Sequence, residues 1–213
     1  MSTMITNRRK MVLFDFDGVI ADSFGAAFKT NKELQENFTE DEYRGMFSGN
    51  INEAFRRREK ENKTQSREGE YFGLYHPRLI ASPIFPGIAE IIKLFSEHYT
   101  LAIISSTISS QISEYLTRYG IAGYFPDILG NDVHPGKKEK IKMILDKHGT
   151  APGNAVFITD TLGDAHEAEA AGVKAIGVTW GYQKKESLTP EKFLFIAETP
   201  GELAKAVISY LSR

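Results

Sequence analysis

An alternation of short apolar runs with amphipathic helices constrains the fold of this chain more than any other feature. The apolar runs lie at residues 11–14, 100–106, 154–160 and 173–180, and helical periodicity fills the segments between the last three. Buried strands that alternate with helices are typical of a parallel sheet covered on both faces. The sequence therefore predicts an α/β fold with a doubly wound, Rossmann-like parallel sheet.

One segment, from about Phe24 to Ile80, breaks this alternation directly after the first apolar run. It is rich in charge, shows no convincing strand and contains several stretches of helical character. Two prolines and a glycine in "ASPIFPG" then lead back into the α/β pattern. We therefore expect a core domain of residues 1–21 and 84–213, with an α-helical cap domain of residues 22–83 inserted into it.

The composition excludes several classes of function. The 213 residues carry a net charge of −2 and no cysteine, so the chain has no strongly basic field for nucleic acid and no thiol chemistry. The sequence shows neither a secretory leader nor an apolar run of about 18 residues, the length that a membrane span needs. We expect a cytoplasmic protein that binds neither nucleic acid nor membrane. Its oligomeric state is left open.

Polar side chains stand where the predicted strands end. In open parallel sheets, ligands bind beyond these carboxyl ends, so the side chains there should converge. A cluster of carboxylates is tolerable when a divalent cation neutralises it, and oxygen ligands without cysteine favour Mg²⁺. Serine and lysine are suited to phosphate oxygens. The residues concerned are Asp15, Asp17, Ser105, Ser106, Asp160 and Asp164, with Lys137 and Lys138 at a helix start.

Four motifs appear in a characteristic order: "DFDGVIADS", "IISS", the lysine of "GKKEK", and "ITDTLGD". In this the chain resembles the haloacid dehalogenase superfamily, specifically the phosphatase branch with a helical cap, of the phosphoglycolate phosphatase type. The resemblance implies that Asp15 is the nucleophile and Asp17 the general acid/base. It also implies that Ser105 and Lys137 bind the phosphoryl group, with Ser106 beside them.

The resemblance further implies a Mg²⁺ cofactor and a set of ligands for it. These ligands would be Asp15, the backbone carbonyl of Asp17, Asp160, and Asp164 directly or through water. For Asp164 the alternative is an ordinary helix N-cap. For the phosphate-binding lysine the alternative is Lys138, because the family's usual proline is absent after the lysine. Another departure from the family's pattern is Thr159, at a position where the family most often has glycine.

The implied reaction is hydrolysis of a phosphomonoester through an aspartyl phosphate. The substrate would be a small phosphorylated metabolite of the phosphoglycolate or sugar phosphate type. A phosphomutase resembling β-phosphoglucomutase is the nearest alternative, and a receiver-like phospho-aspartate signalling domain is the alternative from another class. Within the cap, we interpret the run Arg56 to Arg58 as a solvated helix face, with an anion-binding face as the alternative.

Overall fold

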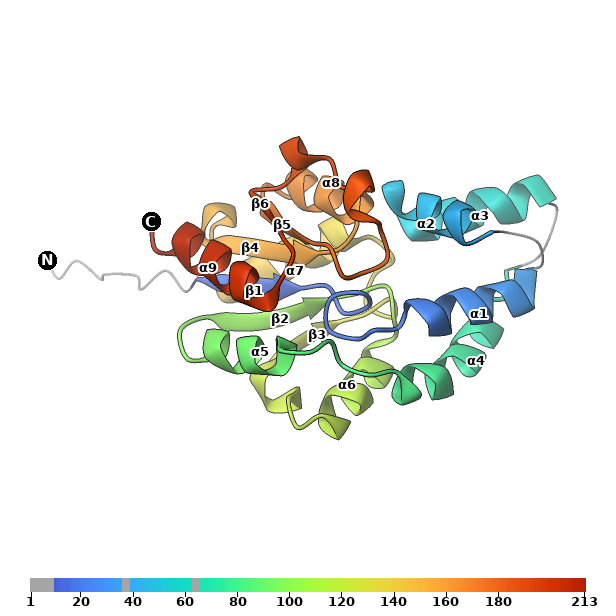
Figure 1. Ribbon diagram of the computed structural model, residues 1–213, viewed down its shortest axis with the longest axis horizontal. Helices are drawn as coiled ribbons and strands as arrows, with labels where there is room; N and C mark the ends of the chain where they lie inside the picture. The colour runs from blue at the N-terminus through green and yellow to red at the C-terminus, as the bar shows by residue number, and fades with distance from the viewer. Residues whose placement is uncertain (1–9, 36–38, 63–65) are drawn as a thin grey trace, which may run out of the picture.

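A six-stranded, fully parallel sheet forms the centre of the molecule (Figure 1). This computed structural model describes residues 10–35, 39–62 and 66–213, so parts of both expected domains, including residues 1–9, lie outside the described residues. The strand order is β3-β2-β1-β4-β5-β6. The strands are β1 (Met11–Phe14), β2 (Thr100–Ile104), β3 (Asp127–Leu129), β4 (Ala155–Thr159), β5 (Lys174–Val178) and β6 (Phe195–Ala197).

The four inner strands are the four predicted apolar runs, and the α/β prediction is confirmed. The two edge strands, β3 and β6, have three residues each and were not predicted. Three residues are too few to show the alternation of a strand. In β6, moreover, Phe195 and Ile196 are partly exposed, so the strand is not a buried apolar run.

Both faces of the sheet are covered by helices, because successive residues of each strand enter opposite hydrophobic clusters. Val12 and Phe14 belong to one cluster, whereas Met11 and Leu13 belong to the other. This explains why the strands read as continuous apolar runs. The first face carries α5 (Ile88–Ser96), α6 (Ser109–Arg118) and α9 (Pro200–Leu211), and the second carries α7 (Lys137–His148) and α8 (Leu162–Ala170).

Four helices form a separate layer beyond the carboxyl ends of the strands (Figure 1). They are α1 (Phe24–Gln35), α2 (Glu40–Gly45), α3 (Ile51–Asn62) and α4 (Glu68–Ala81). The sequence indicated the first three, whereas α4 contains Pro77 in its interior, which weakens the helical signal there. Short 3-10 helices lie at Met46–Ser48, Ala122–Tyr124, Pro152–Asn154, Lys185–Ser187 and Pro190–Lys192.

The two connections between core and cap run side by side. Ala21 bridges Ile84 in antiparallel fashion, and the Asp22 backbone N–H donates to the Pro83 carbonyl at 2.9 Å. The chain therefore leaves and re-enters the core at one point. We propose this paired crossing as the boundary between a core of residues 1–21 and 84–213 and a cap of residues 22–83.

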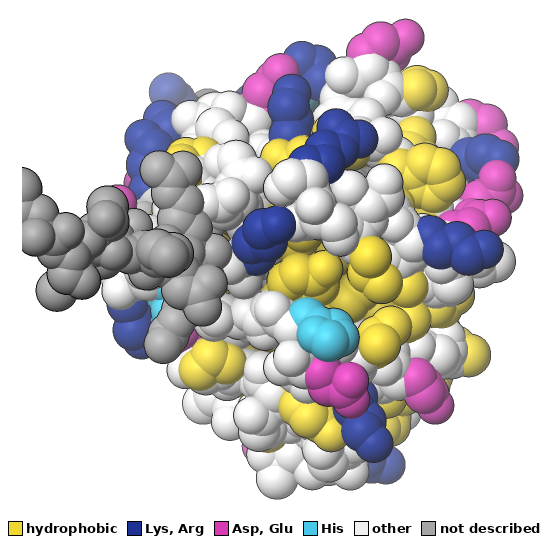
Figure 2. Space-filling view, turned by 90° about the vertical axis from the view of Figure 1, so that its left-hand side faces the viewer, with side chains coloured by type: hydrophobic (Ala, Val, Ile, Leu, Met, Phe, Trp, Pro, Cys, Tyr) yellow, Lys and Arg dark blue, Asp and Glu magenta, His cyan; other side chains and the backbone are white. Residues whose placement is uncertain are grey.

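The end of the molecule opposite the cap is shown in Figure 2, where hydrophobic side chains gather near the middle of the face. This end lies away from the carboxyl ends of the strands and takes no part in the site described below. Among the described residues, no helix is both long enough and apolar enough to cross a membrane.

Candidate active site

Three carboxylates meet at the carboxyl edge of the sheet, at the junction of its two central strands. β1 and β4 are neighbours, and the Asp15 backbone N–H donates to the Ile158 carbonyl at 2.8 Å. This pairing sets Asp15 beside Asp160, and the first turns of α8 add Asp164. One carboxylate oxygen from each lies within 4.8 Å of the others, and all three residues are buried. The structure thus brings together three of the residues that the sequence singled out.

Lys137, the first residue of α7, lies inside this cluster. Its Nζ is 2.7 Å from Asp15 Oδ2 and 2.6 Å from Asp164 Oδ2, and the residue is only 4% exposed. Lys138 instead points outward, with its Nζ 3.8 Å from the Glu139 carboxylate. Of the two lysines, Lys137 is therefore the one placed to contact a group bound at Asp15.

The pKa values in the cluster show how strongly the charges interact. Burial raises the pKa of Asp15 well above its usual range, Lys137 opposes that rise, and Asp164 and Asp160 add to it. Burial likewise raises the pKa of Asp160 to about 7. Burial alone would raise the pKa of Asp164, but the Lys137 ammonium and the hydrogen bonds with Asp15, Lys137 and Thr159 together outweigh burial and lower it. Three carboxylates against one ammonium leave two negative charges without compensation when all are ionised.

Asp160 supplies a structural test of whether a cation fits. Its Oδ2 accepts a hydrogen bond of 2.5 Å from the Tyr182 backbone N–H, but its buried Oδ1 has no hydrogen-bond partner among the described residues. An unpaired buried carboxylate oxygen is costly unless something else binds it. An all-oxygen cluster with two excess negative charges fits a hard divalent cation such as Mg²⁺. The side chain of Asp17 is not in this cluster, so only its backbone carbonyl is a candidate ligand.

Two glycines make room for Asp160. Gly18 has a φ of +77°, and a Cβ there would lie 2.0 Å from Asp160 Oδ2. A Cβ on Gly181 would lie 2.2 Å from the same oxygen. Gly18 thus meets two requirements at once, a left-handed backbone and close approach to a carboxylate.

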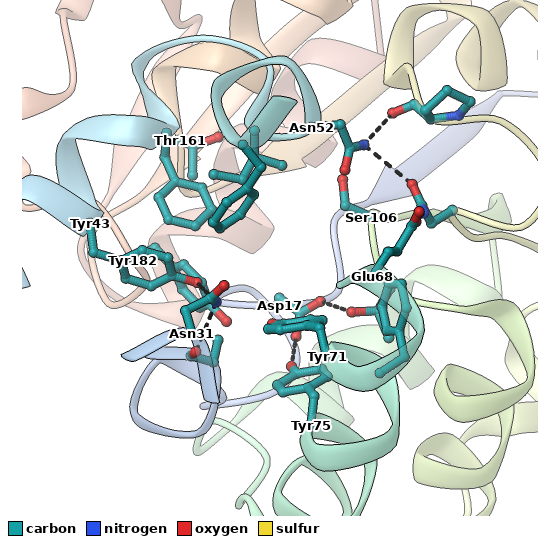
Figure 3. Close-up of a pocket in the computed structure, with 18 of the residues that line it drawn as sticks. Asp17, Asn31, Tyr43, Asn52, Glu68, Tyr71, Tyr75, Ser106, Thr161 and Tyr182 are labelled. Carbon is teal, nitrogen blue, oxygen red and sulfur yellow. Dashed lines mark hydrogen bonds between the residues drawn. The ribbon is translucent and has the colours of Figure 1, made fainter. Parts of the chain in front are cut away.

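Asp17 has a separate environment, although only one residue separates it from Asp15. Its Oδ1 accepts hydrogen bonds from Ser23 Oγ at 2.7 Å and from the Tyr75 hydroxyl of the cap. Its Oδ2 accepts one from Thr107 Oγ1 at 2.7 Å (Figure 3). Asp15 therefore pairs with Lys137 while Asp17 is held by hydroxyl groups. The two neighbouring carboxylates are held in different surroundings, as a division of roles requires.

The two predicted serines differ in position. Ser105 is fully buried, and its Oγ accepts a hydrogen bond of 3.0 Å from the Thr107 backbone N–H. It is not among the described residues that line the cavity above Asp15, whereas Ser106 and Thr107 are. Ser106 is therefore better exposed to a bound phosphoryl group than Ser105.

Several residues of the site were missed by sequence reasoning. Thr159 Oγ1 donates to Asp164 Oδ2 at 2.8 Å, so the departure from glycine adds a hydrogen bond to the cluster. Thr161, not Asp164, caps α8, which leaves the Asp164 carboxylate for Lys137. Lys140 is buried and donates to the Ser105 and Gly130 carbonyls, and burial lowers its pKa to about 8.

Sequence signals existed for some of these residues only. Thr107 continues the hydroxyl run of "ISST", and Thr159 was already marked as a departure from the family's pattern. Tyr75 comes from the cap, and no local pattern connects it with Asp17, 58 residues earlier.

Comparison with known families identifies the family of this chain. The model for haloacid dehalogenase-like hydrolases matches residues 12–178, and the chain belongs to that family. It is 30% identical over 131 residues to a phosphoglycolate phosphatase from Vibrio vulnificus, a match that covers 60% of this chain and 58% of that protein. It is 28% identical over 216 residues to a phosphoglycolate phosphatase from Aquifex aeolicus, covering 95% of this chain and 98% of that protein.

Solved structures share the fold. A haloacid dehalogenase-like family hydrolase from Streptococcus pneumoniae superposes with a TM-score of 0.73 at 24% identity, covering 95% of this chain and 100% of that one. CbbY from Rhodobacter sphaeroides, solved with phosphate, gives a TM-score of 0.70 at 22% identity over 92% of this chain and 96% of that one. These similarities show that the fold is shared.

The packing around Asp160 generates a first prediction. Gly18→Ala should displace the Asp160 carboxylate and strain the turn, so Mg²⁺ affinity and the melting temperature should both fall. Calorimetric titration and thermal unfolding measure the two effects. Gly25→Ala is the matched control, because a Cβ at Gly25 meets no atom within 4 Å. Unchanged Mg²⁺ affinity in Gly18→Ala would contradict the role given to Asp160.

Proposed function

We propose that this protein is a Mg²⁺-dependent phosphomonoester hydrolase that works through an aspartyl phosphate on Asp15. The observation that carries the proposal is the cluster of Asp15, Asp160 and Asp164 around Lys137, with Asp17 held apart from it. An anchored carboxylate, a buried ammonium and a place for a divalent cation are the parts that phosphoryl transfer uses. The names of the curated relatives support the same reaction class.

In the first half-reaction, an Asp15 carboxylate oxygen forms a bond to phosphorus as the ester oxygen leaves. Splitting one displacement into two through a covalent intermediate makes each step easier. The Phe16 backbone N–H donates to Asp15 Oδ1 at 2.7 Å and Lys137 contacts Oδ2, so the nucleophile is oriented from both sides. The Lys137 ammonium also offsets charge on the transferring oxygens. A bound Mg²⁺ would supply further charge compensation and favour ionised Asp15.

Asp17 moves the protons. It donates a proton to the leaving alkoxide, then accepts one from the water that attacks the aspartyl phosphate. That water releases inorganic phosphate and regenerates the Asp15 carboxylate. Ser23, Thr107 and Tyr75 fix the direction of the Asp17 side chain through their hydroxyl groups. The cap, which supplies Tyr75, covers the site and excludes bulk water.

The substrate is a small phosphorylated metabolite, and we expect the protein to act on it in the cytoplasm. A phosphomutase would pass the phosphoryl group of Asp15 to a second sugar hydroxyl instead of water. Release of inorganic phosphate from a single substrate, without a phosphorylated acceptor, distinguishes hydrolysis from that alternative. The inserted cap and the hydrolase family also separate this chain from receiver domains.

Replacement of the nucleophile is the direct test. Asp15→Asn should abolish phosphate release, because a neutral amide neither attacks phosphorus nor compensates a cation. Malachite green assays with p-nitrophenyl phosphate measure turnover, and circular dichroism checks the fold. Asp22→Asn, at an exposed aspartate on the nearby linker, should retain wild-type activity. Turnover above about a tenth of wild type in Asp15→Asn would remove Asp15 as nucleophile.

Replacement of the proton-transfer group should depend on the leaving group. Asp17→Asn should slow hydrolysis by roughly 10²–10⁴, the range for loss of a general acid/base. The loss should be smallest with p-nitrophenolate, which needs little protonation, and largest with an alkoxide. Steady-state kinetics with p-nitrophenyl phosphate and an alkyl phosphate compare the two. Equal losses with both substrates would contradict the acid role.

Metal removal tests whether activity depends on a bound cation. EDTA should inactivate the enzyme and Mg²⁺ should restore it, whereas Ca²⁺ should not, because its larger and looser shell disturbs in-line geometry. Mg²⁺ should also raise the melting temperature of the wild-type protein, and this shift should be lost in Asp160→Asn. Full activity in the metal-stripped protein would end the metal proposal.

A further inference from the structure

The cavity above Asp15 has two chemically different halves. Its volume is about 160 Å³, and its core end carries the carboxylates, Lys137, Ser106 and Thr107. Its cap end is dominated by rings rather than charges. The aromatic residues that line it are Tyr43, Phe47, Phe55, Tyr71, Phe72, Tyr75 and Tyr182.

Six of these seven rings pack against one another in two groups. On α4, Tyr71 stacks on Tyr75 with ring centres 5.3 Å apart, and Phe72 meets Tyr71 edge-on. In the second group, Phe47 lies edge-on to Tyr182 at 5.0 Å and to Tyr43 at 5.2 Å. Figure 3 shows Tyr71 and Tyr75 on one side of the cavity and Tyr43 and Tyr182 on another. Mutually packed rings form an apolar wall before any ligand binds, which lowers the entropic cost of binding.

The charges that line the cap end offer little to a second anionic group. Arg67 is already bound to Glu70 at 2.5 Å and to the Leu34 carbonyl at 2.7 Å. Arg56 lines the edge of the cavity but is exposed, so water screens its charge. Among the described residues that line the cavity, Lys137 is the one buried cation, and Asp15 and Asp164 share it.

The hydrogen-bonding groups at the cap end are largely engaged as well. Asn31 Nδ2 donates to the Ala27 carbonyl at 2.9 Å and to the Tyr43 hydroxyl at 3.1 Å. Asn52 Nδ2 donates to Asn131 Oδ1 at 3.2 Å and to the Pro135 carbonyl at 2.8 Å. A sugar would bury several hydroxyl groups against these occupied amides, at a cost for each unpaired group. An unsubstituted aromatic ring carries no hydroxyl group that would have to be buried in this way.

From these contacts we infer the substrate class: a phosphate monoester whose leaving group carries a single aromatic or heteroaromatic ring. An apolar cavity of about 150 Å³ accommodates benzene, and the 160 Å³ here must also hold the phosphoryl group, so the leaving group can be no larger than about one ring. This inference rests on the proposed phosphatase function and narrows its substrate. The substrate inferred here differs from phosphoglycolate, which the names of this chain's relatives give, because glycolate carries a carboxylate and no ring.

The test compares benzyl phosphate with 2-phosphoglycolate, since both release a primary alcohol and therefore need similar chemistry. kcat/KM should be higher for benzyl phosphate by about tenfold or more, the range for filling an apolar pocket. Glucose 6-phosphate should be a poorer substrate than benzyl phosphate. Equal or better turnover of phosphoglycolate or of the sugar phosphate would overturn the inference while leaving the phosphatase function intact.

Acetyl phosphate distinguishes failure of the phosphatase function from failure of the substrate inference, because its leaving group is small and needs no ring pocket. Its hydrolysis reports the phosphoryl chemistry alone. If acetyl phosphate and the three esters all stay intact with Mg²⁺ present, the proposed function fails, and this inference fails with it.

Substitutions in the apolar wall of rings, called the aromatic wall below, test whether these rings cause the preference for benzyl phosphate. Phe55→Ala should lower kcat/KM for benzyl phosphate by about tenfold more than for acetyl phosphate. Tyr71→Leu, which replaces a ring with an apolar side chain, repeats the test on α4 if Phe55→Ala does not fold. Phe195→Leu is the control, at an exposed ring on β6 outside the cavity lining, and should leave all rates unchanged. Equal effects on both substrates in Phe55→Ala and Tyr71→Leu would overturn the aromatic wall as the specificity determinant.

Discussion

The contact of the Lys137 ammonium with Asp15 and Asp164 is the interaction on which the rest of the site depends. Without it, three buried carboxylates would repel one another where little water screens them. The ammonium keeps Asp164 ionised and moderates the rise in the pKa of Asp15. It also ties the start of α7 to the end of β1 and to the start of α8. The remaining negative charge makes the cluster receptive to a divalent cation.

The parallel sheet makes this contact possible, because every strand ends at the same edge. The adjacency of β1 and β4 brings Asp15 to Asp160, although the two residues are 145 positions apart in the sequence. Close approach of backbone to carboxylate at Gly18 and Gly181 then sets the position of Asp160. Chemistry that needs convergent carboxylates is thus built from loop residues on a rigid, fully buried scaffold.

The cap adds what the core lacks. In the proposed reaction, core residues bind the phosphoryl group that all such esters share, whereas the rings of α2, α3 and α4 face the part that leaves. Tyr75 links the two functions, since it donates to Asp17 and also belongs to the aromatic wall. In the proposed reaction, a leaving group against the rings of α4 lies next to Asp17, the acid that protonates it. Selectivity and proton transfer would then share one surface.

The sequence by itself determined the four inner strands, the inserted helical segment, and Asp15, Asp160, Asp164 and Lys137 as residues that should converge. Apolar periodicity and polar residues at strand ends are local signals, and parallel topology turns them into a site. Only the tertiary structure decided between Lys137 and Lys138, placed Ser106 rather than Ser105 against the cavity, and joined Tyr75 to Asp17. Edge strands of three residues and rings from separate cap helices also needed the fold. These features depend on packing between segments distant in sequence, which no local periodicity encodes.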